Sequence, residues 1–372
     1  MSKIPDVTIG VPVYRGELFI EDALRSIQRQ THQNFKVLIS LDGADPASEK
    51  LCQPFLQDTR FKLVVQPERL GWVGNLNWLM EQVETPYWYF HQQDDLVDPR
   101  YLEVLLEKAE QHPEAAIVYC DMATFGSLNE KFTHSPVLGT APARLLTMLH
   151  EHHSAVPFRG LTRLEALRQV GGIPVNEVEN FSVDTAWVAA IARSGELLRV
   201  PVELYQKRYH SENIHTKWAQ WPFEKRMKAW VIHCTQMLEQ AMQVEATLQE
   251  RCLLWLAAVS RLVSPRTAIG YIPVASLTEV ERQRLLDEFF NQVQHIRKLE
   301  VTVWLETEWE SIRQWTTGFY WFLGNESGDG LKEEKDLRLQ ELQHIQNSKA
   351  WRLMVQWWDF RNRIRAINLF RR

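Results

Sequence analysis

The sequence predicts an α/β protein over its first 215 residues, with a mostly parallel central sheet, followed by an α-helical C-terminal region. Three observations support this prediction. Short apolar runs alternate with amphipathic stretches as far as about Tyr205, which is typical of βα units on a parallel sheet. After about residue 215 the pattern changes to long stretches with helical periodicity. The chain has 372 residues, of which 45% are hydrophobic, so it can bury a large core.

The predicted βα units follow one another in a regular order. Val7–Val13 is the first strand, and Glu17–Arg29 follows as a helix because its apolar residues recur at helical spacing. Two later helices are opened by an Asp-Pro pair, in which Asp caps the helix and Pro occupies its first turn. The remaining elements, in order, are Phe35–Leu41, a helix from Asp45-Pro46, Phe61–Val65, Gly71–Val83, Tyr87–Phe90, a helix from Asp98-Pro99, and Ala115–Cys120.

The second half of the chain is predicted to be helical. Glu224–Leu262 and Glu281–Leu299 have helical periodicity, and Thr278 with Glu281 forms a capping-box pattern. A flexible linker over residues 324–330 precedes a charged helix, Leu331–Asn347, whose weak heptad-like seam would allow two chains to pair as a homo-oligomer. The predicted domains are therefore residues 1–215, 216–323 and 331–372.

Composition excludes several classes of protein. The net charge of −5 argues against a nucleic-acid-binding protein. The four cysteines are scattered without a C-x-x-C pair, which favours a reduced compartment. The chain contains no run of 18 apolar residues, and its first residues lack the apolar region of a signal peptide. We therefore expect a cytoplasmic protein.

Polar residues follow three of the predicted strands at the points where those strands end. Tyr14 follows the first strand, Asp42 the second, and the pair Asp94-Asp95 the fourth. Open α/β folds bind ligands at this edge of the sheet, and paired carboxylates there can hold a divalent cation that neutralises a diphosphate. The alternative is a solvated turn in which Asp serves only the turn geometry. A carboxylate at the second strand end can also accept the imide N–H of a base.

The first 215 residues resemble the family 2 glycosyltransferases, which have the GT-A fold. The order and spacing of five elements carry the resemblance: Pro12-Val13-Tyr14, Ser26-Ile27-x-x-Gln30-Thr31, Leu41-Asp42-Gly43-Ala44, the stretch Gly71–Asn77, and Asp94-Asp95. They cover somewhat over half of the chain and leave the helical remainder unexplained. Leu41 replaces an Asp of the family's second element, and Gln92 and Gln93 precede the metal motif, which implies fewer carboxylates around the cation.

The resemblance implies roles for individual residues. The nucleotide sugar would be bound by Pro12, Val13, Tyr14, Asp42, Arg69, Asn75, Asp94 and Arg208, with Asp42 accepting from the base imide. Asp95 would be the principal ligand of Mn²⁺ or Mg²⁺, aided by Asp94. His210 would complete the metal shell, although a hydrogen-bonded histidine at a strand end is equally compatible with the sequence.

The same resemblance assigns the catalytic base. In the family, an acidic pair at a helix start supplies the base, and here only Asp184 of Val183-Asp184 corresponds to it. A carboxylate near a helix N-terminus is also stabilised as a structural cap, so both interpretations are retained. The helix is predicted to end at Gly195, a residue type common at helix C-termini. Glu179 is the reserve candidate for the base.

These assignments predict a metal-dependent inverting glycosyltransferase. It would transfer a sugar from a UDP-sugar, or from a dTDP-sugar with the same imide, to a saccharide or lipid-linked saccharide in cell-surface polysaccharide synthesis. A sugar-1-phosphate nucleotidyltransferase would need a basic, glycine-rich loop, whereas Val11–Glu17 offers one glycine and one arginine. A non-catalytic sugar-nucleotide-binding or scaffold protein is the other alternative.

The last 24 residues form a basic, aromatic tail. Residues 349–372 contain seven Lys or Arg against one Asp, together with Trp and Phe. Such a segment suits peripheral contact with an anionic membrane, at its inner face for a cytoplasmic protein. The alternative is a terminal helix that packs its tryptophans on the helical region.

Overall fold

The computed structural model describes residues 5–150, 155–211, 213–263 and 277–298. The chain divides into two structural units, Met1–Lys225 and Arg226–Arg372. The predicted linker 324–330, the helix 331–347 and the tail 349–372 lie outside the described residues.

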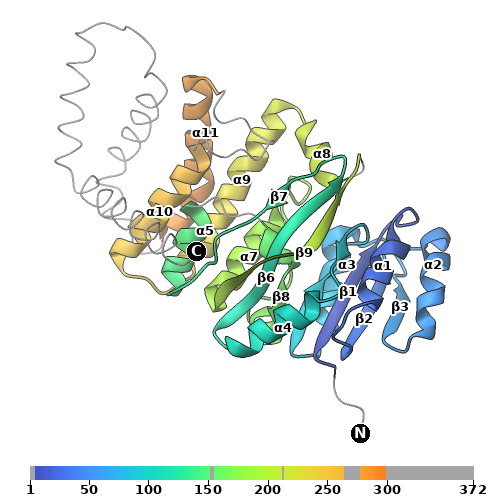
Figure 1. Ribbon diagram of the computed structural model, residues 1–372. Helices are drawn as coiled ribbons and strands as arrows, with labels where there is room; N and C mark the ends of the chain where they lie inside the picture. The colour runs from blue at the N-terminus through green and yellow to red at the C-terminus, as the bar shows by residue number, and fades with distance from the viewer. Residues whose placement is uncertain (1–4, 151–154, 212, 264–276, 299–372) are drawn as a thin grey trace, which may run out of the picture. The chain divides into compact units, whose positions relative to one another are not determined.

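A single curved sheet organises the first unit (Figure 1). Its strands lie in the order β3-β2-β1-β4-β8-β6-β9-β5, with β7 paired to β6. Their bounds are β1 Val7–Val13, β2 Phe35–Leu41, β3 Phe61–Val65, β4 Tyr87–Phe90, β5 Leu96–Val97, β6 Ala115–Gly126, β7 Lys131–Phe132, β8 Leu161–Arg163 and β9 Glu196–Tyr209.

The first four strands in this order are parallel and confirm the predicted βα units. β1 pairs with β2 from Val7↔Phe35 to Val13↔Leu41, so both strands end at the same edge. The strand β8 is antiparallel to both β4 and β6, so the sheet is mixed rather than mostly parallel beyond β4. The long strands β6 and β9 run side by side and in parallel (Figure 1).

The helices of the first unit follow the predicted order. They are α1 Ile20–Gln28, α2 Pro46–Cys52, α3 Gly71–Glu81, α4 Tyr101–Gln111, α5 Ala141–His150, α6 Leu164–Val170, α7 Val183–Ser194 and α8 Ile214–Ala219, with short 3₁₀ turns η1 Gln53–Gln57 and η2 Val156–Arg159. Asp45 caps α2 as predicted, because its side chain accepts from Ser48 N at 3.1 Å. The same prediction for Asp98 is wrong: α4 begins only at Tyr101, and Asp98 Oδ1 instead accepts from Arg100 N in the preceding turn.

Two predicted helices of the second unit are each interrupted. The stretch Glu224–Leu262 is divided into α9, Phe223–Met242, which starts at the end of the first unit, and α10, Leu248–Val263. The region Glu281–Leu299 contains α11, Glu279–Gln292, followed by the 3₁₀ turn η4, Val293–Lys298. The predicted capping box is confirmed, with Glu281 N donating to Thr278 Oγ1 at 3.3 Å. Among the described residues, no helix combines the length and apolar character needed to span a bilayer.

Candidate active site

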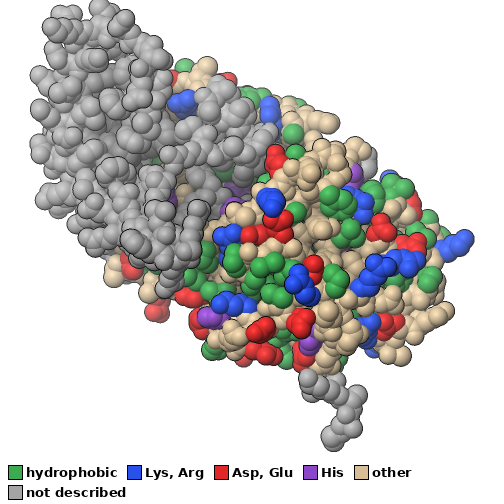
Figure 2. Space-filling view, viewed as in Figure 1, with side chains coloured by type: hydrophobic (Ala, Val, Ile, Leu, Met, Phe, Trp, Pro, Cys, Tyr) green, Lys and Arg blue, Asp and Glu red, His purple; other side chains and the backbone are tan. Residues whose placement is uncertain are grey.

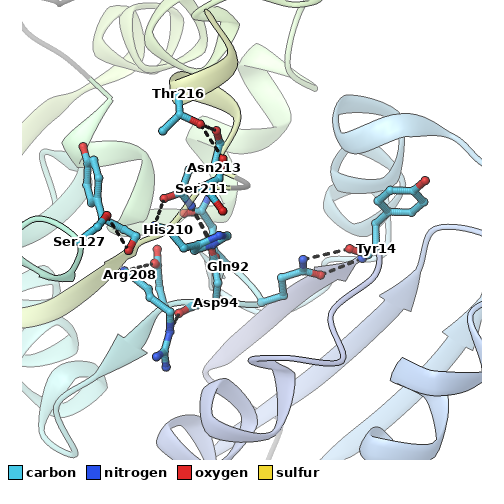
Figure 3. Close-up of polar contacts among 12 residues, drawn as sticks. Tyr14, Gln92, Asp94, Ser127, Arg208, His210, Ser211, Asn213 and Thr216 are labelled. Atoms are coloured by element: carbon cyan, nitrogen blue, oxygen red, sulfur yellow. Dashed lines mark hydrogen bonds and ion pairs between the residues drawn. The ribbon is translucent and has the colours of Figure 1, made fainter. Parts of the chain in front are cut away.

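The ends of β1 and β2 form the first part of the site. Asp42 N donates to Val13 O at 2.8 Å, which joins the two strand ends. Val13 itself is buried, and Pro12 before it is half-buried. The backbone of Tyr14 is fixed by the segment that follows the neighbouring strand β4, because its N–H donates to Gln93 Oε1 at 2.8 Å and its carbonyl accepts from Gln93 Nε2 at 3.0 Å (Figure 3). Gln93, a departure from the family pattern, therefore positions the β1 end.

A cation and an aromatic ring lie beside the Asp42 carboxylate. The Arg69 guanidinium carbon lies 4.1 Å from the centroid of the Tyr14 ring, and Arg69 Nε lies 3.9 Å from Asp42 Oδ2. Asp42 Oδ1 accepts from Leu70 N at 2.6 Å. The Arg69 side chain is 63% exposed whereas that of Asp42 is 3% exposed, so a ligand reaches Arg69 first. The structure thus brings together three of the predicted nucleotide-binding residues.

Asn75 has a different position from the other predicted contacts. It is buried in α3, where its Oδ1 accepts from Ser40 Oγ at 2.6 Å and its Nδ2 donates to Ser40 O at 3.0 Å. Asn77, in the same helix, exchanges two hydrogen bonds with the backbone of Ile173. The asparagines of the Gly71–Asn77 element therefore fix the β2 end and the loop that leads to Asp184.

Asp94 lies at the centre of a polar cluster at the end of β9 (Figure 3). Its Oδ2 accepts from His210 Nε2 at 2.8 Å and from Asn213 Nδ2 at 3.1 Å. Arg208 Nε donates to the Asp94 carbonyl at 3.0 Å. The Asp94 and His210 side chains are 15% and 22% exposed, so both remain accessible from solvent.

Arg208 has contacts on every side of its guanidinium group. Its Nη2 lies 3.3 Å from Asp22 Oδ2, and its guanidinium carbon lies 4.7 Å from the Phe19 ring and 4.6 Å from the Phe125 ring. These contacts orient Arg208 against Asp94 and the start of α1.

Asp95 is fully buried, and both of its carboxylate oxygens accept hydrogen bonds. Tyr205 OH donates to Oδ2 at 2.6 Å, and Arg208 N donates to Oδ1 at 2.8 Å. Burial and the neighbouring Asp94 charge raise the pKa of Asp95 to about 6. This carboxylate therefore ties β9 to the strand end that carries Asp94.

Arg159 is a site residue that the sequence analysis missed. It ends the 3₁₀ turn η2, and its carbonyl accepts from the buried Tyr101 hydroxyl. Its Nε lies 3.7 Å from Asp95 Oδ2, and its Nη2 donates to Gln92 Oε1 at 3.0 Å. No motif surrounds this arginine in the sequence, and Asp95 and Gln92 both precede it by more than 60 positions, so no local signal identifies it.

Asp184 lies in the first turn of α7, as predicted, and is half-buried. Burial raises its pKa above the ordinary value, and the Arg159 charge is the strongest influence that lowers it. The residue preceding the helix, Ser182, makes no side-chain cap bond, and Asp184 Oδ1 accepts from the adjacent Thr185 N at 2.8 Å. The reserve candidate Glu179 is 65% exposed and forms an ion pair with Lys225.

The loop before Asp184 has an unusual backbone. Glu179, Asn180 and Ser182 all have positive φ, from 51° to 57°, which costs side-chain-bearing residues free energy. Asn176 stabilises the loop, because its N–H donates to Asn180 Oδ1 at 3.0 Å and its Nδ2 donates to Phe181 O at 3.0 Å. Such strain is typical of loops that hold a functional residue.

The residues around Asp94 fit a divalent cation in part. Among the described residues no group of three or more His, Cys, Asp and Glu is arranged to hold a metal ion. The Asp94 carboxylate and the His210 imidazole are nevertheless adjacent and accessible, and they are ligands that Mn²⁺ accepts. A cation bound there would take its remaining ligands from a diphosphate and water, since both oxygens of Asp95 are already hydrogen-bonded.

Acidic and basic side chains are interspersed over the described part of the face in Figure 2. This distribution agrees with the small net charge of −5. It offers no support for a nucleic-acid-binding surface over that part of the face.

Comparisons with known proteins agree with this geometry. Residues 8–171 match the family model described as Glycosyl transferase family 2. Putative glycosyltransferase EpsH of Bacillus subtilis is 27% identical over 210 residues, which make up 56% of this chain and 56% of EpsH. Teichoic acid poly(glycerol phosphate) polymerase of Staphylococcus epidermidis is 33% identical over 110 residues, or 29% of this chain and 15% of that protein. The matched segment thus spans about half, or much less, of these relatives.

Solved structures show the same fold. The match with the crystal structure of S. aureus TarS 1-349 in complex with UDP covers 88% of this chain and 94% of the TarS chain, with a TM-score of 0.57 and 13% identity. A second crystal structure, of S. aureus TarS, matches 79% of this chain and 50% of the TarS chain, with a TM-score of 0.57 and 14% identity. The N-terminal domain therefore has the GT-A fold, with carboxylates along one edge of its sheet. The N-terminal domain is similar to glycosyl transferase family 2 over residues 8–171, which are less than half of the 372-residue chain.

Proposed function

We propose that the protein is an inverting glycosyltransferase that uses a nucleoside diphosphate sugar, preferentially a UDP-sugar, and a hydroxyl acceptor. One observation carries the proposal. The Arg159 charge interacts both with a half-buried carboxylate, Asp184, and with Asp94, which is hydrogen-bonded to His210. A base on one side of a site and a diphosphate-binding cluster on the other are what an in-line displacement requires.

The donor nucleotide would bind at the ends of β1 and β2. The nucleobase would lie beside the Tyr14 ring, with its imide N–H donating to the Asp42 carboxylate. Arg69 would move aside or cover the nucleobase. UDP is supported because the structurally similar TarS 1-349 has been crystallised in complex with UDP. We propose that Asn75 acts indirectly here, by fixing Ser40, which lies two residues before Asp42 in the chain.

The diphosphate would lie beside Asp94, His210 and Arg208. A Mn²⁺ or Mg²⁺ ion held by Asp94 and His210 would neutralise the diphosphate charge when bound. Asp95, predicted as the principal ligand, would serve this site mainly by fixing β9 through Tyr205 OH and Arg208 N.

In the reaction, Asp184 would accept the proton of the acceptor hydroxyl. The acceptor oxygen forms a bond to the anomeric carbon while the bond from that carbon to the phosphate oxygen breaks. The electron pair of the broken bond leaves with the nucleoside diphosphate. Asp184 is suited to this role because burial raises the pKa of its carboxyl, which makes it a stronger base than an exposed Asp, while the Arg159 charge favours its ionised form.

The acceptor is proposed to be a saccharide or lipid-linked saccharide used in cell-surface polysaccharide synthesis. The teichoic acid polymerase among the relatives supports this class of pathway. We further propose a cytoplasmic location with peripheral contact at the inner face of the membrane through residues 349–372, which lie outside the described part of the chain.

A thermal-shift panel tests the donor proposal. The protein is heated with UDP, dTDP, GDP and CMP, each with and without Mn²⁺ or Mg²⁺. A ligand at one hundred times its Kd stabilises the folded state by about 2.7 kcal/mol, so the cognate nucleotide should raise the Tm measurably. Release or transfer of sugar from the matching donor then separates an enzyme from a non-catalytic binding protein. Absence of any nucleotide-dependent shift would contradict the proposal.

A further inference from the structure

Lys207 lies on β9 between two tyrosines that share its side of the strand. Alternate residues of a strand point to the same face, so Tyr205, Lys207 and Tyr209 face one way and Arg208 faces the other. Tyr205 contacts Asp95, and Lys207 Nζ lies 4.9 Å from the centroid of the Tyr209 ring. The Lys207 side chain is thereby directed towards the face that holds Asp95 and Arg159.

Several charged groups of the site act on the Lys207 ammonium without forming an ion pair with it. Asp95, Asp184 and Asp94 attract it and Arg159 repels it, while burial lowers its pKa to about 8. Its nearest acidic neighbour along β9, Glu203, is paired with Lys131. Within the described residues, the Lys207 side chain makes no hydrogen bond and no ion pair, and its ammonium contacts the Tyr209 ring instead.

The two arginines nearest to Asp94 and Asp95 already have partners. Arg159 contacts Asp95 and Gln92, and Arg208 contacts Asp22 and the Asp94 carbonyl. A half-buried lysine without an anionic partner costs free energy, and protein sequences seldom retain one without a reason. An anion supplied by a ligand would remove that cost.

We propose that Lys207 binds an oxygen of the donor phosphate that is attached to the transferred sugar. This inference rests on the proposed function. In an in-line displacement, the anomeric carbon and its phosphate oxygen lie between the base and the diphosphate cluster, and the carboxylates on both sides, Asp184 and Asp94, attract Lys207. A lysine ammonium offers three donors and a compact charge, which suit a phosphate oxygen.

Lys207 would also contribute to the chemical step. When the bond between the anomeric carbon and the phosphate oxygen breaks, negative charge accumulates on the departing diphosphate, and a fixed ammonium beside it lowers the energy of the transition state. The lysine keeps its proton throughout, because the acceptor proton goes to Asp184. No further reactant is needed.

The test compares a nucleoside diphosphate with its monophosphate. Kd values for UDP and UMP are measured by calorimetry with saturating Mg²⁺ for wild type, Lys207→Met, Lys207→Arg and the control Lys62→Met. Lys62 is an exposed lysine on β3. We expect Lys207→Met to weaken UDP about 10- to 100-fold, as loss of a charged hydrogen bond does, and to leave UMP unchanged. Lys207→Arg should retain most of the affinity, and Lys62→Met all of it.

Each other outcome has a definite meaning. Equal weakening of UDP and UMP, or unchanged UDP affinity, in Lys207→Met would overturn the assignment while leaving the proposed function intact. Failure of the wild type to bind UDP or any other diphosphate of the thermal-shift panel would overturn the proposed function, and this inference with it. If the panel selects dTDP, the dTDP and dTMP pair replaces UDP and UMP. Lys207→Gln serves if the Met variant does not fold.

Discussion

Replacing Asp184 with asparagine separates catalysis from helix capping. Asparagine keeps the shape of the side chain and an oxygen that can accept from Thr185 N, as Asp184 Oδ1 does at 2.8 Å. Asparagine cannot, however, take up the proton of the acceptor hydroxyl. We therefore expect Asp184→Asn to bind donor like the wild type and to lose transfer.

The expected sizes of the two effects follow from the environment of Asp184. Loss of a general base lowers the rate about 10²- to 10⁴-fold, or roughly 2.7–5.4 kcal/mol in the activation free energy. The free energy of unfolding, unlike the transfer rate, should not fall in Asp184→Asn. The folded-state pKa lies above the ordinary 3.8, so the free energy of unfolding falls as pH rises from 3.8 through the folded pKa, and the ionised group remains costly above it. The uncharged variant should therefore be at least as stable as wild type at pH 8.

The assay is single-turnover transfer at pH 8 with saturating donor, beside calorimetric donor affinity and Tm. Lys62→Met again serves as the matched control. Near wild-type transfer by Asp184→Asn would refute the assignment of the base and direct attention to Glu179. Transfer and Tm that both stay close to wild type in Asp184→Asn would instead support a capping role alone, which asparagine retains.

Four other perturbations test separate parts of the site. Asp94→Ala should abolish the Mn²⁺- or Mg²⁺-dependent part of the nucleotide thermal shift, and an unchanged metal-dependent shift would remove Asp94 from the metal site. Tyr205→Phe removes the buried donor to Asp95 Oδ2 and should cost about 1–3 kcal/mol in the free energy of unfolding by urea denaturation, whereas an unchanged midpoint would contradict this. In a profile of transfer rate against pH, Arg159→Met should shift the acid limb to higher pH, because Arg159 lowers the pKa of Asp184. Arg159→Lys should restore the wild-type limb. An unshifted limb in Arg159→Met would exclude this role. Deleting residues 349–372 should release the protein from anionic liposomes at low salt with donor binding retained, and equal sedimentation of both proteins would reject the tail as an anchor.

Local patterns were sufficient to predict the parallel part of the sheet. The predicted bounds of β1, β2, β3 and β4 agree with the structure because each strand is a short apolar run between turn-forming residues. The Asp45 cap was predictable for the same reason, since its bond to Ser48 spans only three residues. Asp98 shows the limit of such reasoning. The same Asp-Pro pair forms a turn there, because the Asp98 main chain is engaged by distant partners, with its N–H donating to Leu204 O and its carbonyl accepting from Gln30 Nε2.

Gly195 shows a similar limit at the end of α7. Its position after the helix was predicted, but its φ of −173° is extended rather than left-handed. A Cβ at this position would lie 2.8 Å from Glu114 O and 2.9 Å from Ala116 Cβ, so the close approach of another segment requires the glycine. Only the packed structure contains that reason.

The sequence by itself determined the strand ends after which Tyr14, Asp42 and Asp94 lie, and the helix start that carries Asp184, because each of these residues follows a recognisable strand or opens a recognisable helix. Tertiary structure alone decided which of the nearby charges are engaged. Arg159 reaches Asp95 across 64 positions, and Tyr205 reaches it across 110, so no local pattern could reveal that Asp95 is enclosed while Lys207 has no anionic partner among the described residues. Burial and pairing depend on contacts between segments that are distant in the chain, and these contacts set the electrostatics of the site.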